Sequence, residues 1–267
     1  MKDWGLTVNG LVARPLTLTY EEVLARPSVS AIVTLECIGN SVAGEYIGTA
    51  KWGGFSLRGL LEEAGASSSA VDVVFHAADG YSDSIPFARA MVGDVLVVNR
   101  MNEAILPLAH GFPVRMIVPG HYGMKSVQWL TRIQVVERDY KGYYQQKGWT
   151  DDATVKTTSW IESPIHGSRL RGEHHRIQGV AFAGNRGVQR VEVSFDEGLS
   201  WGPATLAPPL GPAAWVFWHF DWAVTQEGSA TILVRAIDGQ GRVQSDEEEG
   251  PAPAGTTGLH AVSVKVV

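Results

Sequence analysis

The sequence predicts an α+β domain with a mixed sheet, followed by an all-β sandwich of the immunoglobulin-like kind. Up to residue 136, strand-like apolar runs alternate with short helical segments, which is typical of α+β proteins. From residue 158 onward, short strand-like runs recur between turn signals, which favours a β-sandwich. The residues between them, 137–157, are aromatic, polar and aperiodic, so we interpret them as the connection. We place the first domain at residues 1–150 and the second at 151–267.

Composition limits the classes of function. Of the 267 residues, 45% are hydrophobic and 19% are charged, which describes a globular chain with enough apolar residues for two cores. The formal charge of −6 argues against a nucleic-acid partner, because nucleic-acid phosphates select basic surfaces. We find no secretory signal and no apolar run long enough to span a bilayer, so we expect a soluble chain. The compartment stays open, and an extracytoplasmic one would suit a chain that is a fragment of a longer protein.

The elements of the first domain follow from local signals. Trp4–Leu11 alternates like a strand, and Thr19 with Glu22 forms a capping box that predicts a helix over Tyr20–Ala25. The apolar run Ala31–Leu35 predicts a buried strand. Further on we expect a helix from residue 57 to 64, a short helix over residues 86–91, and strands over Val71–His76, Val95–Val98, Phe112–Val118 and Val127–Val136.

Turn signals divide the second domain into strands. Runs such as Gly184-Asn185-Arg186-Gly187 separate segments that alternate or are continuously apolar. The predicted strands are Ile177–Ala183, Val188–Phe195, Trp215–Val224, Ala230–Ile237 and His260–Val267.

Cys37, the single cysteine, is the first candidate for chemistry. It follows the Ala31–Leu35 strand and enters a Gly39-Asn40 turn. A free cysteine is either a small buried hydrophobic residue or a reactive thiolate and metal ligand, and its immediate neighbours leave both open. One cysteine excludes an intramolecular disulfide.

Four segments, in this order, give the chain its resemblance to a known family. They are LECIGN around Cys37, TAKWGGFSLRGLL (Thr49–Leu61), YSDSIP (Tyr81–Pro86) and HGFPVRMIVPGHYGMKSVQWL (His110–Leu130). This order resembles the molybdopterin-binding domain of the sulfite oxidase family. The run Gly179–Trp201 in the second half resembles the family's dimerisation domain, an immunoglobulin-like sandwich.

The resemblance implies a cofactor, molybdenum–molybdopterin, with Cys37 as the thiolate ligand of molybdenum. A soft thiolate suits a metal that also carries the dithiolene sulfurs of the pterin. Arg115 lies inside a predicted strand, where its guanidinium needs either an anion or a buried Asp or Glu. The residues that fall on the family's cofactor contacts are His110, Arg115, Ser126, Val127 and Gln128.

Two further cofactor contacts are inferred by comparing this sequence with the family's pattern. Gln128 occupies a position that is usually lysine in sulfite-oxidising members, and we expect Lys125 or His121, which lie close in the sequence, to supply the missing charge. Asp79 matches an acidic pterin contact. We interpret Tyr81, Asp83 and Ser84 as ordinary turn residues, and the alternative for His110 is a simple loop histidine.

The predicted substrate pocket lacks charges that the sulfite-oxidising members have. Where those members carry two arginines after the C-x-G-N turn, this chain has Ser41-Val42. Their active-site tyrosine falls on Trp149 in an ungapped count, or on Tyr140 in a shifted alignment. A dianion binds poorly without fixed cations, so we expect a neutral oxygen donor or acceptor, such as a sulfoxide or N-oxide, rather than sulfite.

The resemblance therefore implies a molybdenum oxidoreductase that transfers an oxygen atom to or from a small molecule. One cysteine excludes a haem-attachment motif, so we expect electrons to pass to or from a separate electron-transfer protein or a membrane redox module. The sandwich implies a homodimer. Two alternatives stay open: a cofactor-free homologue that serves as a binding or assembly module, and the soluble domain of a larger membrane-attached redox protein.

Overall fold

The computed structural model describes residues 4–224 and 226–267. The chain divides into two compact units, Met1–Leu35 with Ala50–Ala153, and Glu36–Thr49 with Thr154–Val267. The expected boundary at residues 150 and 151 lies three residues before the division at Ala153. The segment Glu36–Thr49, which carries Cys37, groups with the second unit, whereas the sequence analysis assigned it to the first.

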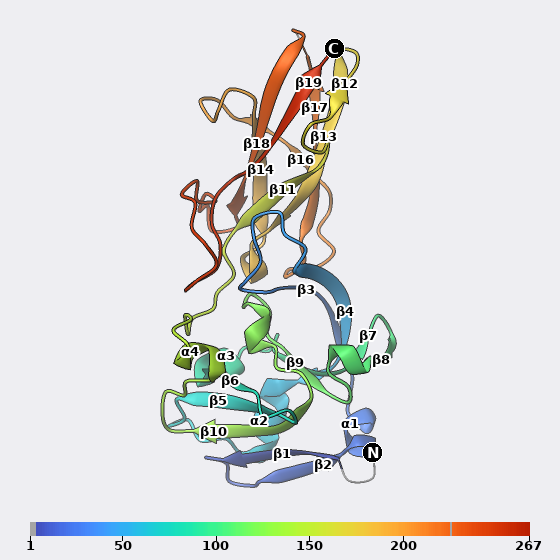
Figure 1. Cartoon of the computed structure of the whole chain (residues 1–267). Coiled ribbons are helices and arrows are strands. Elements are labelled where there is room, and N and C mark those ends of the chain that lie inside the picture. Colours follow the sequence, from blue (N-terminus) through green and yellow to red (C-terminus); the bar gives the residue numbers. More distant parts are fainter. Residues whose placement is uncertain (1–3, 225) are drawn as a thin grey trace. The chain divides into compact units, whose positions relative to one another are not determined.

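The first sheet of the first unit contains β1 (Gly5–Gly10), β2 (Leu16–Thr19), β5 (Asp72–Ala77), β6 (Ser82–Pro86) and β10 (Leu130–Val136). Their order is β2-β1-β10-β5-β6, and Figure 1 shows β5, β6 and β10 side by side. β1 lies parallel to β10, whereas the other neighbouring strands are antiparallel, so the sheet is mixed as predicted.

The second sheet of this unit contains β3 (Val29–Glu36), β4 (Ile47–Ser56), β7 (Leu96–Met101), β8 (Ala104–Ile105) and β9 (Arg115–Ile117). Its order is β3-β4-β7-β8, with β9 paired to β7. No strand was predicted at β4, whose Gly48, Gly53 and Gly54 have low strand propensity. Glycine is required at residue 54, since a Cβ there would lie 2.0 Å from the carbonyl oxygen of Val97 on β7.

The predicted helix α1 (Tyr20–Ala25) is confirmed with its capping box. The Thr19 hydroxyl accepts the Glu22 N–H, and the Glu22 carboxylate accepts the Thr19 N–H. The other helices are α2 (Leu57–Ala64), α3 (Phe87–Ala90) and α4 (Tyr143–Gln146), with short 3₁₀ turns η1 (Leu108–His110), η2 (Gly123–Lys125) and η3 (Gly184–Arg186). No helix in the described part of the chain is long and apolar enough to cross a membrane.

α2 anchors the core of the first unit. Ser56 caps its N-terminus, and Gly65 ends it in the left-handed conformation that glycine adopts without strain. Its buried side chains belong to the same apolar cluster as residues of β1, β5 and β10; the four on α2 are Leu57, Leu60, Leu61 and Ala64.

Two expectations for the first unit were wrong. Residues 82–84 were interpreted as part of a turn, but they form β6, because Asp83 and Ser84 are buried and have hydrogen-bond partners inside the fold. The stretch from residue 137 to 157 is not wholly irregular, since it contains α4. The predicted strand over Val127–Val136 begins at Leu130.

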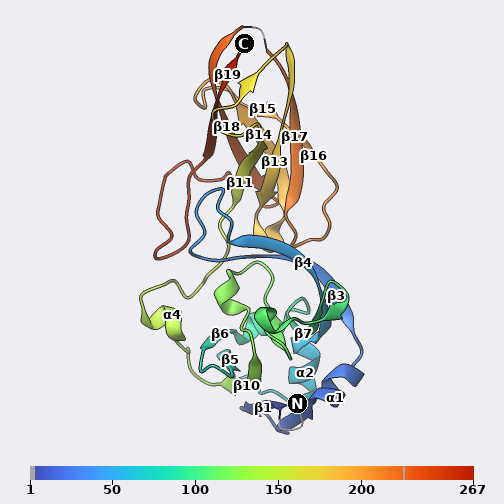
Figure 2. The same cartoon turned by 45° about the vertical axis from the view of Figure 1, so that its right-hand side comes forward.

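The second unit contains two sheets. One contains β11 (Thr158–Ser163), β13 (His174–Phe182), β16 (Thr205–Leu206) and β17 (Val216–Ala223) in the order β11-β13-β17-β16, and Figure 2 shows β13 beside β17. The other contains β12 (Arg169–Leu170), β14 (Val188–Ser194), β15 (Gly202–Pro203), β18 (Gly228–Asp238) and β19 (His260–Val266), in the order β12-β19-β18-β14-β15.

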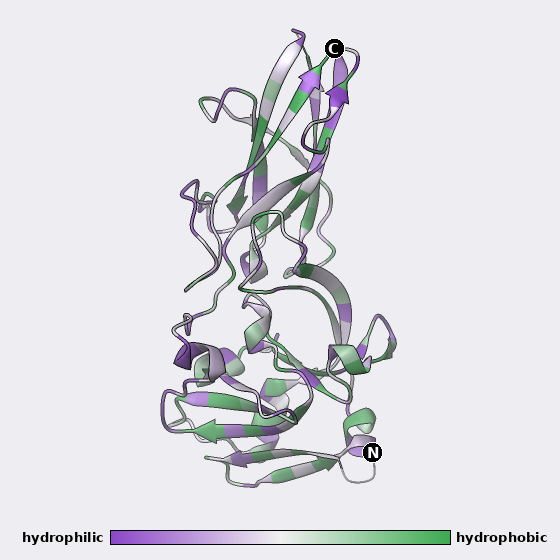
Figure 3. Ribbon diagram, in the orientation of Figure 1, coloured by the Kyte–Doolittle hydropathy of each residue, from purple (hydrophilic) through white to green (hydrophobic). Residues whose placement is uncertain are grey.

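Alternating side chains from the two sheets build the core of this sandwich. β19 alternates between buried valines and more polar residues, which appear as changing bands in Figure 3. The five predicted strands of this half are confirmed, whereas β11 and the two-residue strands were not predicted individually. The core is formed by Ile161, Ile177, Ala181, Val191, Val193, Trp218, Ile232, Val234, Ala236, Val262 and Val264.

Candidate cofactor site and the residues around it

The loop that follows β3 presents Cys37. Its backbone N–H donates to the carbonyl of Tyr46 at 2.9 Å, and its thiol is exposed. The N–H of Gly39 donates to Sγ at 3.4 Å. An exposed thiol with a backbone donor can ligate a metal, which a core cysteine could do only after a rearrangement.

Beside Cys37, Glu36 is a buried carboxyl group. Its Oε1 accepts a hydrogen bond from Asn40 Nδ2 at 3.0 Å, whereas Oε2 is buried and has no partner in the structure. Burial raises the pKa of Glu36 to about 7, although the bond from Asn40 acts in the opposite direction.

In the first unit, Arg115 is a buried cation held by neutral groups. Its side chain is 4% exposed. Nη1 donates to the His110 carbonyl at 3.0 Å and Nη2 to the Ser126 carbonyl at 2.9 Å, while the guanidinium lies 5.1 Å from the Trp52 ring centroid. Burial lowers the pKa of Arg115 to about 10. Among the described residues no carboxylate pairs with it, so the acidic partner that the sequence left open is not found and an anion would be well placed.

Arg115 lies beside two other predicted cofactor contacts, His110 and Gln128. His110 is exposed at the end of η1, and Gly111 follows it with φ +105°. A Cβ on Gly111 would lie 3.0–3.2 Å from atoms of Arg115 and Gln128, so this glycine permits the close approach of their chain segments. His110, Arg115 and Gln128 are therefore neighbours in the fold.

Ser126 and Val127 accept hydrogen bonds from backbone N–H groups of the neighbouring chain segment. Ser126 Oγ accepts the Val118 N–H at 3.0 Å, and the Val127 carbonyl accepts the Met116 N–H at 2.8 Å. Both side chains are buried, whereas Gln128 is half-buried. The side chain of Gln128 is thus the most accessible of the three.

Lys125 is placed differently from the sequence interpretation. Its ammonium donates to Asp83 at 2.8 Å and to Asp151 at 3.1 Å, and the side chain is buried. Two carboxylates of the protein neutralise the charge that we expected it to offer to a cofactor.

Tyr140 and Trp149, the two candidates for the active-site aromatic residue, have different surroundings. The Tyr140 hydroxyl shares a 2.7 Å hydrogen bond with Ser82 Oγ, and its backbone N–H donates to Asp72. Trp149 is partly exposed and makes an edge contact with Tyr144, with 6.2 Å between ring centroids. Asp79 lies in the exposed turn between β5 and β6, where its carboxylate accepts the Tyr81 N–H.

Both halves of the chain match known family models. Residues 1–144 match the model of the oxidoreductase molybdopterin binding domain, and residues 150–250 match that of the Mo-co oxidoreductase dimerisation domain. The chain belongs to this family of molybdopterin-binding oxidoreductases. Family membership implies the molybdenum–molybdopterin cofactor, as the sequence predicted.

Sulfite oxidases and nitrate reductases are among the relatives of the chain. The chain is 33% identical to sulfite oxidase of Gallus gallus, with 91% of the chain and 64% of the relative covered. It is 31% identical to the mitochondrial sulfite oxidase of Drosophila melanogaster, covering 93% of the chain and 52% of the relative. It is also 31% identical to NADH nitrate reductase of Solanum lycopersicum, with 88% of the chain and 33% of the relative covered. The chain therefore spans only part of these relatives.

A solved structure extends the likeness to both halves of the fold. The sulfane dehydrogenase SoxCD of Paracoccus pantotrophus matches with a TM-score of 0.81 and 25% identity, over 98% of this chain and 76% of that chain. The α+β domain followed by a β-sandwich is thus the family's architecture.

The residues of the first unit fit the family's cofactor in one respect that can be read directly. A molybdopterin carries a phosphate, and Arg115 is a buried guanidinium whose hydrogen-bond acceptors are carbonyl oxygens rather than carboxylates. Such a group binds an anion without displacing an internal ion pair.

Sequence reasoning missed the buried pair of Asp83 with Lys125. Asp83 is fully buried and also accepts from the Tyr81 hydroxyl at 3.0 Å. Burial is the main cause that raises the pKa of Tyr81, and the nearby Asp83 charge raises it further. No local signal marks this cluster, because Lys125 lies 42 positions after Asp83.

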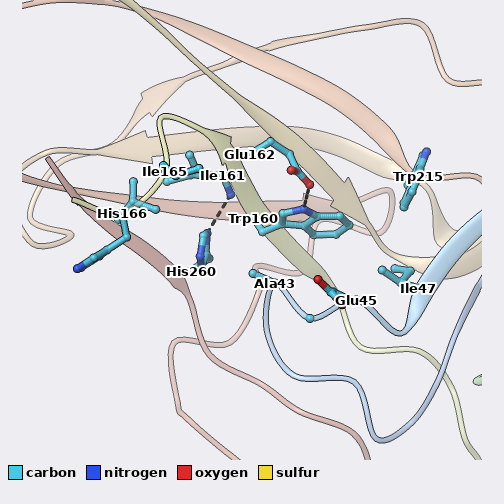
Figure 4. A pocket seen from close by; sticks show the side chains of 12 residues that line it. Ala43, Glu45, Ile47, Trp160, Ile161, Glu162, Ile165, His166, Trp215 and His260 are labelled. Atoms are coloured by element: carbon cyan, nitrogen blue, oxygen red, sulfur yellow. Dashed lines mark hydrogen bonds between the residues drawn. The ribbon is translucent and has the colours of Figure 1, made fainter. Parts of the chain in front are cut away.

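A cavity of about 450 Å³ lies in the second unit, a size within the range of small-molecule pockets. Figure 4 shows Trp160 with Glu162 and Glu45 near its indole, and His260 below Ile161. His260 Nδ1 accepts the Ile161 N–H at 3.0 Å, and His166 Nδ1 accepts the Ser263 N–H at 3.3 Å. Each imidazole therefore caps a backbone donor of a strand in the sandwich.

Proposed function

We propose that the chain is a molybdenum-cofactor-dependent oxidoreductase of the sulfite oxidase type, with Cys37 as the protein ligand of the metal. The observation that carries this proposal is the exposed Cys37 thiol, with a backbone N–H donated to Sγ, in a chain whose residues 1–144 match the molybdopterin-binding model. When bound, the cofactor supplies two-electron oxygen-atom transfer chemistry. The protein supplies the thiolate, the binding groups and the surroundings of the substrate.

Arg115 is the proposed binding residue for the cofactor's phosphate. Its two Nη atoms already donate to the carbonyls of His110 and Ser126, so the guanidinium plane is fixed before the anion arrives. A fixed, charged donor loses little conformational entropy on binding. His110 and Gln128, which neighbour Arg115, are proposed to complete the polar contacts to the pterin.

A neutral oxygen donor or acceptor is the proposed substrate, such as a sulfoxide or an N-oxide. The segment from Glu36 to Thr49 contains two glutamates and no lysine, arginine or histidine. Fixed cations attract small dianions, and their absence from this segment makes sulfite a poor substrate. Trp149 is the proposed aromatic residue of the substrate pocket, because the Tyr140 hydroxyl is bound to Ser82.

The proposed partners are a separate redox protein and a second copy of the chain. One cysteine excludes a haem-attachment motif in this sequence, so electrons would pass to or from a separate protein or a membrane redox module. The match of residues 150–250 to a dimerisation domain supports a homodimer.

Metal analysis tests the enzyme proposal. Protein from a host that makes molybdenum cofactor should hold close to one molybdenum per chain, and Cys37→Ser should lose metal or change its absorption spectrum. Gly48→Ala is a matched control in the same segment, because a Cβ at residue 48 meets no atom within 4 Å. Absence of molybdenum from the parent protein would favour the cofactor-free binding module instead.

A charge-restoring variant tests the substrate proposal. Ser41→Arg combined with Val42→Arg restores the two cations that sulfite-oxidising members carry in this segment. We expect the KM for sulfite to fall about tenfold or more, with little change in the KM for a sulfoxide. Low-KM sulfite oxidation by the parent protein would contradict the proposed substrate class, but not the proposed cofactor.

A further inference from the structure

The loop from Cys37 to Tyr46 is closed by hydrogen bonds that converge on Asn40. The Asn40 N–H donates to the Cys37 carbonyl at 2.9 Å, and Asn40 Oδ1 accepts the Tyr46 N–H at 3.0 Å. The Cys37 N–H donates in turn to the Tyr46 carbonyl at 2.9 Å. The loop around the thiol is therefore held by the backbone N–H and side chain of Asn40, together with the bond between Cys37 and Tyr46.

Asn40 is 6% exposed, and each of its polar groups has a partner. Its Nδ2 donates to Glu36 Oε1 at 3.0 Å, which connects the loop back to the end of β3. A Cβ on Gly44 would lie 2.4 Å from Asn40 Oδ1, so the loop closes tightly around this amide. An amide whose oxygen and nitrogen are both hydrogen-bonded favours one geometry, because any other leaves a buried polar atom of Asn40 unpaired.

The last partner of Asn40 comes from the far end of the sequence. Thr256 Oγ1 donates to the Asn40 carbonyl at 2.6 Å, across 216 positions. Thr256 lies in the segment between β18 and β19, and that segment is itself anchored. Gln244 Nε2 donates to the Gly258 carbonyl at 2.9 Å, while Gln244 Oε1 accepts from Ser159 Oγ on β11 at 2.7 Å.

We propose that the sandwich unit positions the thiol of Cys37, and that Asn40 and Thr256 are the positioning residues. The inference rests on the proposed role of Cys37 as metal ligand. It gives the second unit a part in metal ligation besides dimerisation. The path runs from Ser159 through Gln244 and the Thr256 segment to Asn40, and all of these residues belong to the second unit.

Hydrogen exchange in the full-length chain, prepared without cofactor, tests the positioning directly. The amides of Asn40 and Tyr46 donate to groups within the loop, so they report on its closure. Thr256→Val removes the hydroxyl donor at almost constant volume, and Thr256→Ser retains it. We expect about tenfold faster exchange of both amides in Thr256→Val and in Asn40→Ala, as loss of a hydrogen bond of ~1.4 kcal/mol implies, and parent-like exchange in Thr256→Ser.

Thr257→Val is the matched control. Its hydroxyl also donates to a backbone carbonyl at 2.6 Å, that of Glu247, but it has no hydrogen bond to Asn40. We expect this variant to leave the Asn40 and Tyr46 amides unchanged. Unchanged exchange in Thr256→Val, or an equal increase in Thr257→Val, would overturn the proposal.

The metal-loaded protein supplies a second readout. We expect Thr256→Val to alter the thiolate-to-metal charge-transfer absorption at parent-like metal content, and Thr256→Ser to restore it. If Cys37→Ser shows the parent's absorption band, the proposed ligand is wrong, whereas the exchange result still decides whether Thr256 holds the loop. A parent-like band in Thr256→Val would overturn the positioning role while leaving the ligand proposal intact.

Discussion

The Lys125 ammonium lies 2.8 Å from the Asp83 carboxylate, with side chains that are 2% and 0% exposed. Asp83 also accepts from the Tyr81 hydroxyl, and Tyr81 donates to the Met124 carbonyl. The pair thus connects β6 to η2, the turn that precedes the proposed cofactor contacts Ser126–Gln128.

Lys125→Met should therefore destabilise the protein strongly. It leaves the Asp83 carboxylate buried without its cation, which costs about 3–5 kcal/mol of unfolding free energy. Lys141→Met is the control, because Lys141 makes exposed ion pairs with Asp139 and Asp151, which are worth about 1 kcal/mol or less. Urea denaturation measures the unfolding free energy of both variants. Equal losses would show that the buried pair contributes no more stability than the exposed pairs.

Arg115→Lys should lose cofactor. A lysine ammonium cannot reproduce the two parallel bonds to the His110 and Ser126 carbonyls while facing an anion. We expect pterin content, measured by the fluorescence of the oxidised pterin, to fall about tenfold or more, as loss of ~1.4 kcal/mol or more of charge-assisted bonding implies.

Arg89→Lys is the matched control for that experiment. Arg89 also donates to a backbone carbonyl, that of Pro119, and pairs with Asp94. We expect a stability change without cofactor loss. Parent-like pterin content in Arg115→Lys would remove Arg115 from the proposed site.

The stability of the second unit should fall in acid because of His260. Burial is the main cause that lowers the pKa of His260 below its ordinary 6.5, with the Glu162 charge acting to raise it and His166 to lower it. The stability that this group contributes is therefore present above pH 6.5 and is lost as the pH falls through the folded-state pKa. Protonation of Nδ1 also removes the acceptor for the Ile161 N–H.

Denaturation at a series of pH values measures this effect. We expect His260→Gln, which keeps an acceptor and cannot titrate, to show a shallower loss of unfolding free energy between about pH 7.5 and pH 5. His174→Gln, at an exposed position on β13, should follow the parent curve. The same slope in all three proteins would exclude His260 as the cause.

Tyr140→Phe should affect stability more than kinetics. The change removes a hydroxyl that is bound to Ser82 Oγ, at a cost of about 1 kcal/mol in unfolding free energy. If Tyr140 contacted the substrate instead, kcat would fall at unchanged stability. Steady-state kinetics beside thermal denaturation distinguishes the two.

Elements with local start and stop signals could be predicted from the sequence. The capping box of Thr19 and Glu22 and the Gly65 terminus define α1 and α2 without reference to the rest of the fold. The sandwich strands were predictable for the same reason, since their alternation and turns are local. β4 was missed because its glycines serve a tertiary purpose: Gly54 makes room for the carbonyl of Val97.

The residues of the candidate site could be proposed from the sequence, whereas several of their hydrogen bonds and ion pairs could not. The neighbourhood of His110, Arg115 and Gln128 follows from their closeness in sequence. The pairing of Lys125 with Asp83 does not, because burial and charge balance depend on segments 42 positions apart. The contact of Thr256 with Asn40 spans 216 positions, so no local pattern could assign the Cys37 loop to the second unit.

The exposed thiol of Cys37 has a practical consequence for handling the protein. In cofactor-free chains under air, this thiol is open to oxidation, and the sequence offers no second cysteine with which it could form an internal bridge. Two chains joined through Cys37 would run as a covalent dimer that has nothing to do with the sandwich. Oligomeric state should therefore be measured in reductant, and, with Cys37 as the proposed metal ligand, the fraction of chains that cross-link without reductant is expected to follow the fraction that lacks metal.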